Sequence, residues 1–245
     1  MRVSLFFLIL IVCPLLIFTG CKTVNERFSG YVPEPSLLNK PLIDGLLVEK
    51  VINAQPQEEN LPFNPNEDPW ILIPFCFYSA QKVDPLVKRN FFQSNLDEAL
   101  QRLFIKDLRA SHISRTISCT DTTNLNRDFW KNKYRLQIIL KHAVWNRNIT
   151  AYGISYVGTI LWSLGLPVSY GDVQLEIEAQ LFPPGEAKKP IATTVLKGNR
   201  SCVELIYDQV GYRSSVSEDK LTEIFPEIAR DLRKFMIKNL KKAKK

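Results

Sequence analysis

Histidine is scarce in this sequence, which contains only His112 and His142. Neither has a cysteine, aspartate or glutamate at the spacing that metal ligands take, so the pattern predicts no metal site. The short motifs of serine hydrolases, zinc proteases, P-loop proteins and dinucleotide-binding proteins are also absent. We therefore expect a protein that is not an enzyme, with no catalytic residues and no cofactor.

Cysteine is sparse too, and no C-x-x-C pair occurs among the five. Cys13 lies inside the apolar run of residues 3–18, and Cys21 lies three residues after the end of that run. Cys76, Cys119 and Cys202 remain, which is an odd number. One disulfide with one free thiol and three separate thiols are both compatible with this count, because spacing alone does not choose a pair.

Charge is missing from one internal segment, residues 149–171. Its glycines and Pro167 weaken a continuous helix, and its two flanking segments look like strands of one sheet, so we reject a membrane span. Two interpretations remain. The segment either packs on the core or forms an exposed apolar flap that enters a bilayer interface or covers an acyl chain. The residues expected to contact membrane or lipid are Tyr152, Tyr156, Leu161, Trp162, Leu164 and Leu166.

The amino terminus is apolar from residue 3 to residue 18, apart from Ser4 and Pro14, and Arg2 precedes it. This length is typical of the apolar region of a signal peptide. The run ends in Thr19-Gly20-Cys21, preceded by Phe18. The ending resembles the lipobox of bacterial prolipoproteins, in which leucine is usual at the place of Phe18.

The resemblance implies that residues 1–20 are a lipoprotein signal peptide and that Cys21 carries a diacylglyceryl thioether and becomes an acylated (palmitate-bearing) amino terminus. Several acyl chains on one residue hold a protein at a membrane. In the sorting rule of enterobacterial lipoproteins, aspartate directly after the acylated cysteine favours retention in the inner membrane. This chain has Lys22 at that position, which implies a periplasm-facing protein of the cell outer membrane. Anchorage in the inner membrane is the alternative. From the residues alone, an uncleaved transmembrane anchor is the competing interpretation.

The remainder predicts one domain on a tether. Proline recurs through residues 21–68, which indicates an extended tether, although the apolar patch Leu42–Ile52 suits a strand or packing on the domain. Residues 69–240 form the expected periplasmic α+β domain, and residues 241–245 form a basic tail. Much of the excess behind the net charge of +7 lies at this end of the chain, in Lys238, Lys241, Lys242, Lys244 and Lys245. Because an exported protein does not meet nucleic acid, the tail predicts anionic lipid as partner or, alternatively, only a solvated helix end.

Periodicity places the elements of that domain. Strands are expected at residues 70–78, 113–119, 134–144, 173–181 and 191–197, and helices at residues 94–110 and 218–240. Pro226 predicts a break near Phe225 in the second helix. Glu176 and Glu178 share a strand face, and their alternation with glutamine indicates a solvated face, not a catalytic pair. This order predicts an α+β fold, with a mixed or antiparallel sheet and two helices on one face.

The segments Tyr152-Gly153-Ile154-Ser155 and Trp162-Ser163-Leu164-Gly165-Leu166-Pro167 resemble a motif of uncharacterised bacterial envelope lipoproteins. The element order is similar to the amino-terminal domain of the Tol-system translocation protein and to small outer-membrane assembly lipoproteins. The resemblance implies a structural, assembly or partner-binding role without an established activity, with an envelope protein or anionic lipid as partner. The alternative is a lipid or glycolipid carrier that uses residues 149–171 as a lid.

Overall fold

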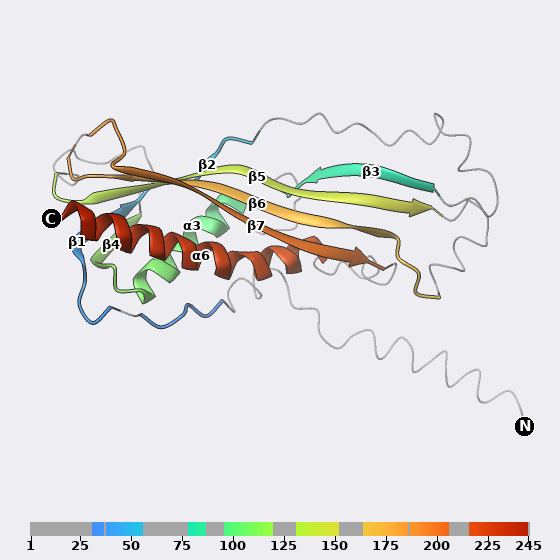
Figure 1. The fold of residues 1–245 in the computed structure, drawn as a ribbon, viewed down its shortest axis with the longest axis horizontal. Helices are drawn as coiled ribbons and strands as arrows, with labels where there is room; N and C mark the ends of the chain where they lie inside the picture. Colours follow the sequence, from blue (N-terminus) through green and yellow to red (C-terminus); the bar gives the residue numbers. More distant parts are fainter. Residues whose placement is uncertain are drawn as a thin grey trace, which may run out of the picture.

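The computed structural model describes residues 31–36, 38–55, 78–86, 96–119, 131–151, 164–185, 187–205 and 216–244. These residues form one mixed β-sheet with two helices, α3 (Leu96–Ala110) and α6 (Val216–Ala243), packed against one face (Figure 1). The predicted α+β class is therefore confirmed. The expected signal peptide, Cys21, Cys76 and most of the strand expected at residues 70–78 lie outside the described residues.

The sheet is built around one long strand, β5 (Tyr134–Ala151). One edge of β5 pairs antiparallel with β6 (Ser169–Phe182), which in turn pairs antiparallel with β7 (Ala192–Glu204). The other edge of β5 pairs with three shorter strands in succession along its length, and the first of them also pairs with β4 (Ser114–Cys119). These three strands are β1 (Ile43–Val48), β2 (Ile52–Asn53) and β3 (Tyr78–Pro85).

The apolar side chains that alternate with polar ones in the sequence lie on the face of the sheet that the helices cover. In β6 every second side chain is buried, and the turn after it returns the chain as β7, as expected. The apolar stripe of α3 is also buried, which confirms that helix. The buried residues of these two elements are Val173, Leu175, Ile177, Ala179 and Leu181 in β6, and Leu96, Leu100, Leu103, Phe104 and Leu108 in α3.

The break predicted near Phe225 is wrong, because α6 is helical from Val216 to Ala243 and Pro226 lies inside it. An interior proline costs a helix about 3 kcal/mol. Phe225 before the proline and Ile228 after it are both buried in the same core. Burial of large apolar side chains contributes about 1.5–3 kcal/mol each, so packing on both sides of Pro226 outweighs the local cost.

The patch Leu42–Ile52, within the range expected to be a tether, supplies β1 and β2. Leu46, Leu47 and Val48 are fully buried, and β1 lies between β4 and β5 in the sheet. Part of the range 21–68 is therefore part of the folded sheet. At the other end of the chain, α6 continues to Ala243, so residues 241–243 of the expected basic tail are helical.

Candidate functional site

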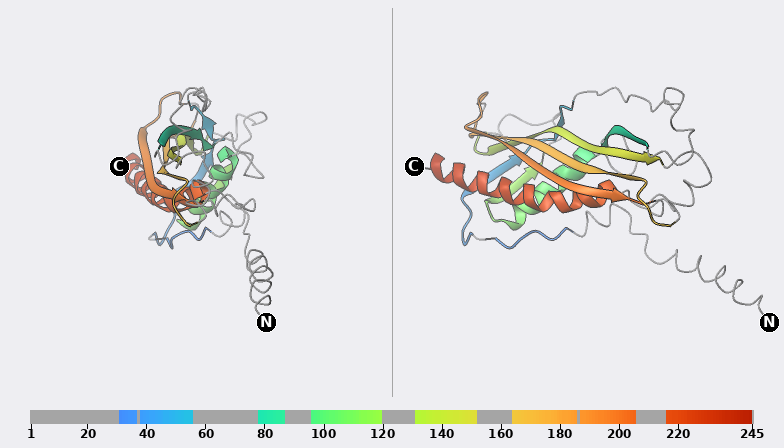
Figure 2. Two further views of the ribbon diagram at one scale, coloured as in Figure 1. Left: turned by 90° about the vertical axis from the view of Figure 1, so that its right-hand side faces the viewer. Right: turned by 45° about the vertical axis from the view of Figure 1, so that its right-hand side comes forward.

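Exposed apolar side chains gather at the end of the sheet where β6 begins and β7 ends. Leu164 is 76% exposed and Leu166 is also exposed, in the segment that leads into β6. Tyr170 of β6 and Val203 of β7 are direct cross-strand partners, and both are exposed. We call Leu164, Leu166, Tyr170 and Val203 the apolar tip; it lies at the end of the molecule away from the carboxyl terminus (Figures 1 and 2).

A buried polar cluster lies directly beside the apolar tip. The Glu204 carboxylate, in a residue that is 5% exposed, accepts hydrogen bonds from Ser169 Oγ at 2.7 Å and from Arg147 Nη1 at 3.3 Å. The Val168 N–H donates to the Glu204 carbonyl at 2.8 Å. The Arg147 guanidinium also lies over the Trp145 ring, 4.7 Å from its centroid. These contacts hold residues 168 and 169 against β7, so the exposed side chains of the apolar tip project from an ordered base.

The segment expected to contact lipid is only partly described. Leu164 and Leu166 are exposed beside the sheet, whereas Tyr152, Tyr156, Leu161 and Trp162 lie outside the described residues. The two strands that flank the segment are antiparallel neighbours, with Ile149 opposite Ser169. Both ends of the segment therefore leave the same end of the sheet, which agrees with the rejection of a membrane span.

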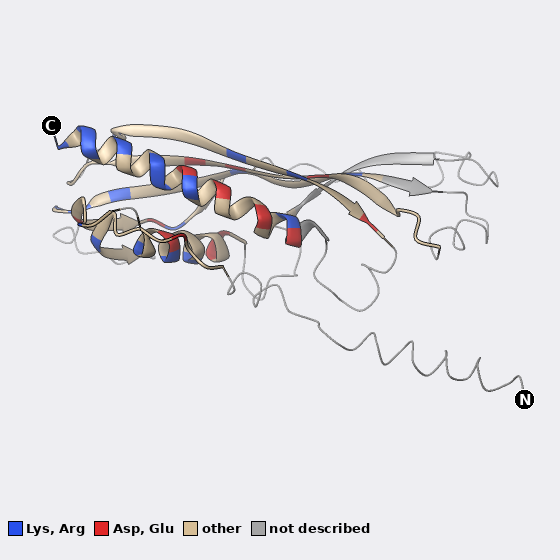
Figure 3. Cartoon of the chain, turned by 60° about the horizontal axis from the view of Figure 1, so that its bottom comes forward, with Lys and Arg blue, Asp and Glu red and all other residues tan. Residues whose placement is uncertain are grey.

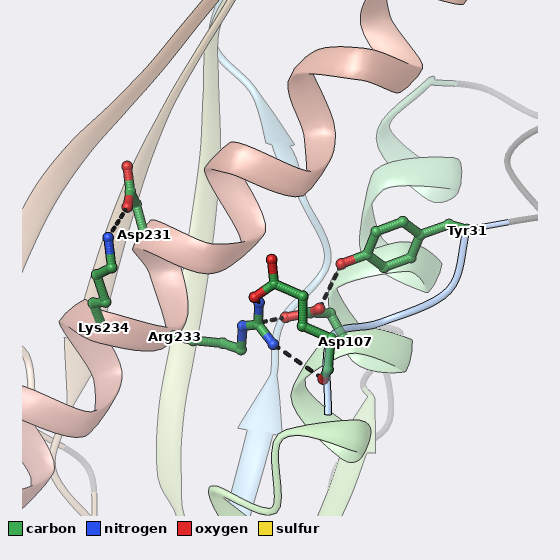
Figure 4. A network of polar contacts seen from close by, with 6 residues as sticks. Tyr31, Asp107, Asp231, Arg233 and Lys234 are labelled. Atoms are coloured by element: carbon green, nitrogen blue, oxygen red, sulfur yellow. Dashed lines mark hydrogen bonds and ion pairs between the residues drawn. The ribbon is translucent and has the colours of Figure 1, made fainter. Parts of the chain in front are cut away.

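A second polar cluster joins the chain that follows the expected lipid anchor to both helices (Figure 4). Asp107 of α3 is 1% exposed. Its carboxylate accepts a hydrogen bond from the Tyr31 hydroxyl at 2.6 Å and lies 3.4 Å from Arg233 Nε of α6. Arg233 also forms an ion pair with Glu34. We call Tyr31, Glu34, Asp107 and Arg233 the docking cluster.

Burial dominates the electrostatics of the docking cluster. It raises the pKa of Asp107, and the hydrogen bond from Tyr31 and the charge of Arg233 oppose that rise. Burial and the bond to Asp107 raise the pKa of Tyr31 well above its ordinary range, so the hydroxyl stays protonated and remains a donor.

Further contacts hold the same amino-terminal segment on the helices. Ser36 Oγ donates to the Ser111 carbonyl at 2.6 Å, and Lys106 Nζ donates to the Tyr31 carbonyl. The Tyr31 ring packs edge-on against Phe225, with 5.0 Å between centroids. Residues 31–36 are thus fixed along the seam between α3 and α6.

The sequence reasoning missed the docking cluster, although the sequence contains a signal for it. Asp107 lies three residues after Phe104, on the apolar stripe of α3, and Arg233 lies three residues before Met236, on the apolar stripe of α6. A charged residue on the buried face of a helix is rarely left without a partner. One acid and one base in such positions on two helices predict an ion pair between them.

A third feature is a collection of lysines at the opposite end of the molecule from the apolar tip. The carboxyl-terminal half of α6 is rich in basic residues (Figure 3). The turn between β6 and β7 brings two more exposed lysines to the same end (Figure 2). We call these residues the basic pole, and they are Lys188, Lys189, Lys238, Lys241, Lys242 and Lys244.

The glutamates on the open face of β6 are neutralised by lysines. Glu176 pairs with Lys197 at 2.8 Å, and Glu178 pairs with Lys141 at 2.9 Å. Hydrogen bonds from Gln180 and Lys141 lower the pKa of Glu178, which is the opposite of what a general acid needs. The structure thus agrees with the solvated-face interpretation.

Within the described ranges, no three histidine, cysteine or acidic side chains are grouped to hold a metal ion. Neither helix described here combines the length and hydropathy that crossing a bilayer requires. Cys119 is a free, exposed thiol, and Cys202 is a free, buried thiol whose pKa is raised by burial. These two cysteines are therefore not paired with each other.

No family model matches this chain, and no curated protein matches it. Among solved structures it is similar to protein XCC0632 from Xanthomonas campestris, of the family model DUF330, with 10% identity, a TM-score of 0.44, and coverage of 87% of this chain and 95% of that one. It is also similar to a protein from Helicobacter pylori described as a neuraminyllactose-binding hemagglutinin homologue, with 10% identity, a TM-score of 0.44, and coverage of 89% and 96%. Both TM-scores lie below 0.5.

Proposed function

We propose that this chain is a non-enzymatic envelope lipoprotein, anchored through acylated Cys21, that uses the apolar tip to bind another protein of the envelope. The apolar run that ends in Thr19-Gly20-Cys21 supports the anchor. By the position of Lys22, the membrane is the outer one and the domain faces the periplasm.

The observation that carries the binding role is the exposure of the apolar tip on an ordered base. Val203 is 54% exposed although it lies on a paired strand, and its cross-strand partner Tyr170 is 46% exposed. Large apolar side chains grouped on a surface mark a binding site more often than chance exposure does. Aromatic side chains such as Tyr170 are also enriched in the centres of protein interfaces.

The alternative, a lipid or glycolipid carrier, requires an internal space for an acyl chain. Between the sheet and the helices, the described core is closed to solvent, with Ile177, Leu232 and Phe225 each no more than 1% exposed. The exposed apolar surface lies instead on the outside of the molecule, at the apolar tip. This arrangement favours a binding module over a carrier.

Cys21→Ser tests the anchor in the full-length protein. Intact mass should show a wild-type chain that begins at Cys21 and carries acyl groups, and a variant that keeps its signal peptide or lacks lipid. An identical, unacylated mass for both proteins would refute the anchor.

Photo-crosslinking in the producing cell tests the apolar tip. A photoreactive amino acid at Leu164 should give a discrete adduct, and Leu166→Asp should reduce its yield at least about tenfold, because a charge buried in an interface costs more than 1.4 kcal/mol. The matched control places the same probe at Val195, which is exposed in β7 outside the apolar tip. Equal adducts from both positions, or an adduct only with lipid, would overturn the proposed protein partner.

A further inference from the structure

We infer that the basic pole lies against the anionic headgroups of the same membrane that holds Cys21, so that the domain has a fixed orientation with the apolar tip facing away from the bilayer. This inference rests on the proposed lipid anchor. It assigns a partner, an anionic lipid surface, to a part of the molecule that the proposed protein-binding role does not use.

The charge of the basic pole is available for an external partner. Lys238, Lys241, Lys242 and Lys244 are exposed, and no ion pair involves them within the described residues. By contrast, Lys234, one turn earlier, is paired with Asp231 at 2.9 Å.

The carboxylates described near this end of the sheet are already paired. Asp44 lies 3.9 Å from Arg115, and Glu49 lies 3.2 Å from Arg135. Arg135 also donates to the carbonyl of Ala187, which precedes Lys188 and Lys189. The lysines of the basic pole therefore face solvent, while the shielded acid at this end, Glu49, is paired with Arg135.

The docking cluster brings the basic pole within reach of the bilayer. Tyr31, held on Asp107, is ten residues after Cys21, so the chain between them spans at most about 35 Å. Arg233 contacts the same Asp107, and Lys244 is eleven residues further along α6, a distance of about 17 Å at the helical rise. The basic pole is thus nearer to the docking point than the tether is long.

The apolar tip lies at the other end of the sheet. β6 runs from Ser169, beside the apolar tip, to Phe182, just before the turn that contains Lys188 and Lys189. Its thirteen steps correspond to about 44 Å. When the basic pole rests on the bilayer, the apolar tip is held away from it.

Tethering favours a lipid surface over a free acidic protein as the partner of the basic pole. An anchored domain meets its own membrane at a high effective concentration, so a weak contact suffices. Each lysine near an anionic surface strengthens binding by about fivefold, and a group of several acts together. The cations also suit the end of the α6 dipole, but that role requires no partner and does not depend on the lipid.

Lysine footprinting on proteoliposomes tests the inference with the full acylated chain. The protein is reconstituted in phosphatidylcholine vesicles with or without phosphatidylglycerol, and acetylation of each lysine is followed by mass spectrometry. We expect Lys238, Lys241 and Lys242 to react at least about fivefold more slowly on the anionic vesicles, and to recover at roughly 0.5 M salt. Lys197, exposed on the sheet, should react equally on both.

A charge variant separates lipid contact from helix stability. Lys241→Gln with Lys242→Gln and Lys244→Gln should abolish the lipid-dependent protection of Lys238, whereas Lys197→Gln should leave it intact. Acylated protein whose Lys238 reacts equally on the two kinds of vesicle, or protection that high salt does not reverse, would overturn the inference. An intact mass without acyl groups would instead overturn the proposed anchor.

Discussion

Asp107 shows how one residue determines the path of the chain. Its carboxylate is buried between Tyr31 from the amino-terminal segment and Arg233 from α6. A buried carboxylate without partners is strongly unfavourable, so all three side chains are needed together. The cluster therefore selects one position for residues 31–34 that apolar packing alone would specify less closely.

Replacing Arg233 by methionine should lower the free energy of unfolding by about 3–5 kcal/mol, because the Asp107 carboxylate would stay buried without its cation. Urea unfolding followed by circular dichroism measures this change. The matched control is Lys234→Met, which removes only an exposed pair with Asp231 and should cost less than about 1 kcal/mol. Equal effects of the two substitutions would contradict a structural role for the buried pair.

At the level of elements, the contact between α6 and β7 depends on a glycine. A Cβ added at Gly198 would lie 2.2 Å from Cγ2 of Ile224, which is itself fully buried. The absence of a side chain at this position lets the helix approach the strand closely. This close contact sets the distance between α6 and the sheet. It therefore also sets where the lysines at the carboxyl-terminal end of α6 lie relative to the sheet.

We expect Gly198→Ala to lower the free energy of unfolding by about 1–3 kcal/mol, as overpacking of a well-filled core does. In an Ile224→Ala background the same substitution should cost at least about 1 kcal/mol less, because the obstructing methyl group is gone. A double-mutant cycle by urea unfolding measures this coupling. Additive effects would show that the contact at Gly198 does not set the packing of α6.

For the whole molecule, the docking cluster shortens the effective tether. Without it, the first residue of the sheet is Ile43, which is 22 residues after Cys21, so the domain could move up to about 75 Å from the proposed anchor. With Tyr31 docked, the limit is about 35 Å. A short tether restricts the orientations that the domain can adopt at the membrane.

On phosphatidylcholine vesicles, which offer the basic pole no anionic surface, Tyr31→Ala combined with Glu34→Ala should therefore increase the mean distance between domain and membrane. Energy transfer from a dye on the exposed thiol of Cys119 to labelled lipid should fall, in a Cys76→Ser background that leaves Cys119 as the accessible thiol. Val32→Ala is the matched control, since Val32 is 82% exposed in the same segment. Unchanged transfer in a variant that retains its helical circular dichroism would refute the shortened tether.

Much of the fold was predictable because its signals are local. The period of two in residues 173–181 and the apolar stripe of residues 96–108 reflect which face of each element meets the core. Those patterns predicted β6, the β6–β7 hairpin and α3, and the order of elements predicted the α+β class. The residues that resemble a lipobox are likewise adjacent in the chain, so the expected anchor at Cys21 depends on no tertiary contact.

The remaining features arise from residues that are distant in the chain. Tyr31, Asp107 and Arg233 meet only when both helices pack on the sheet, and Tyr170 meets Val203 only through the pairing of β6 with β7. Pro226 stays within one helix because burial on both sides outweighs the local cost of the missing hydrogen bond. Local sequence therefore determined most of the elements and the expected anchor, whereas packing energy, which sums over non-local contacts, decided that α6 continues through Pro226, where residues 31–36 dock and which side chains remain exposed.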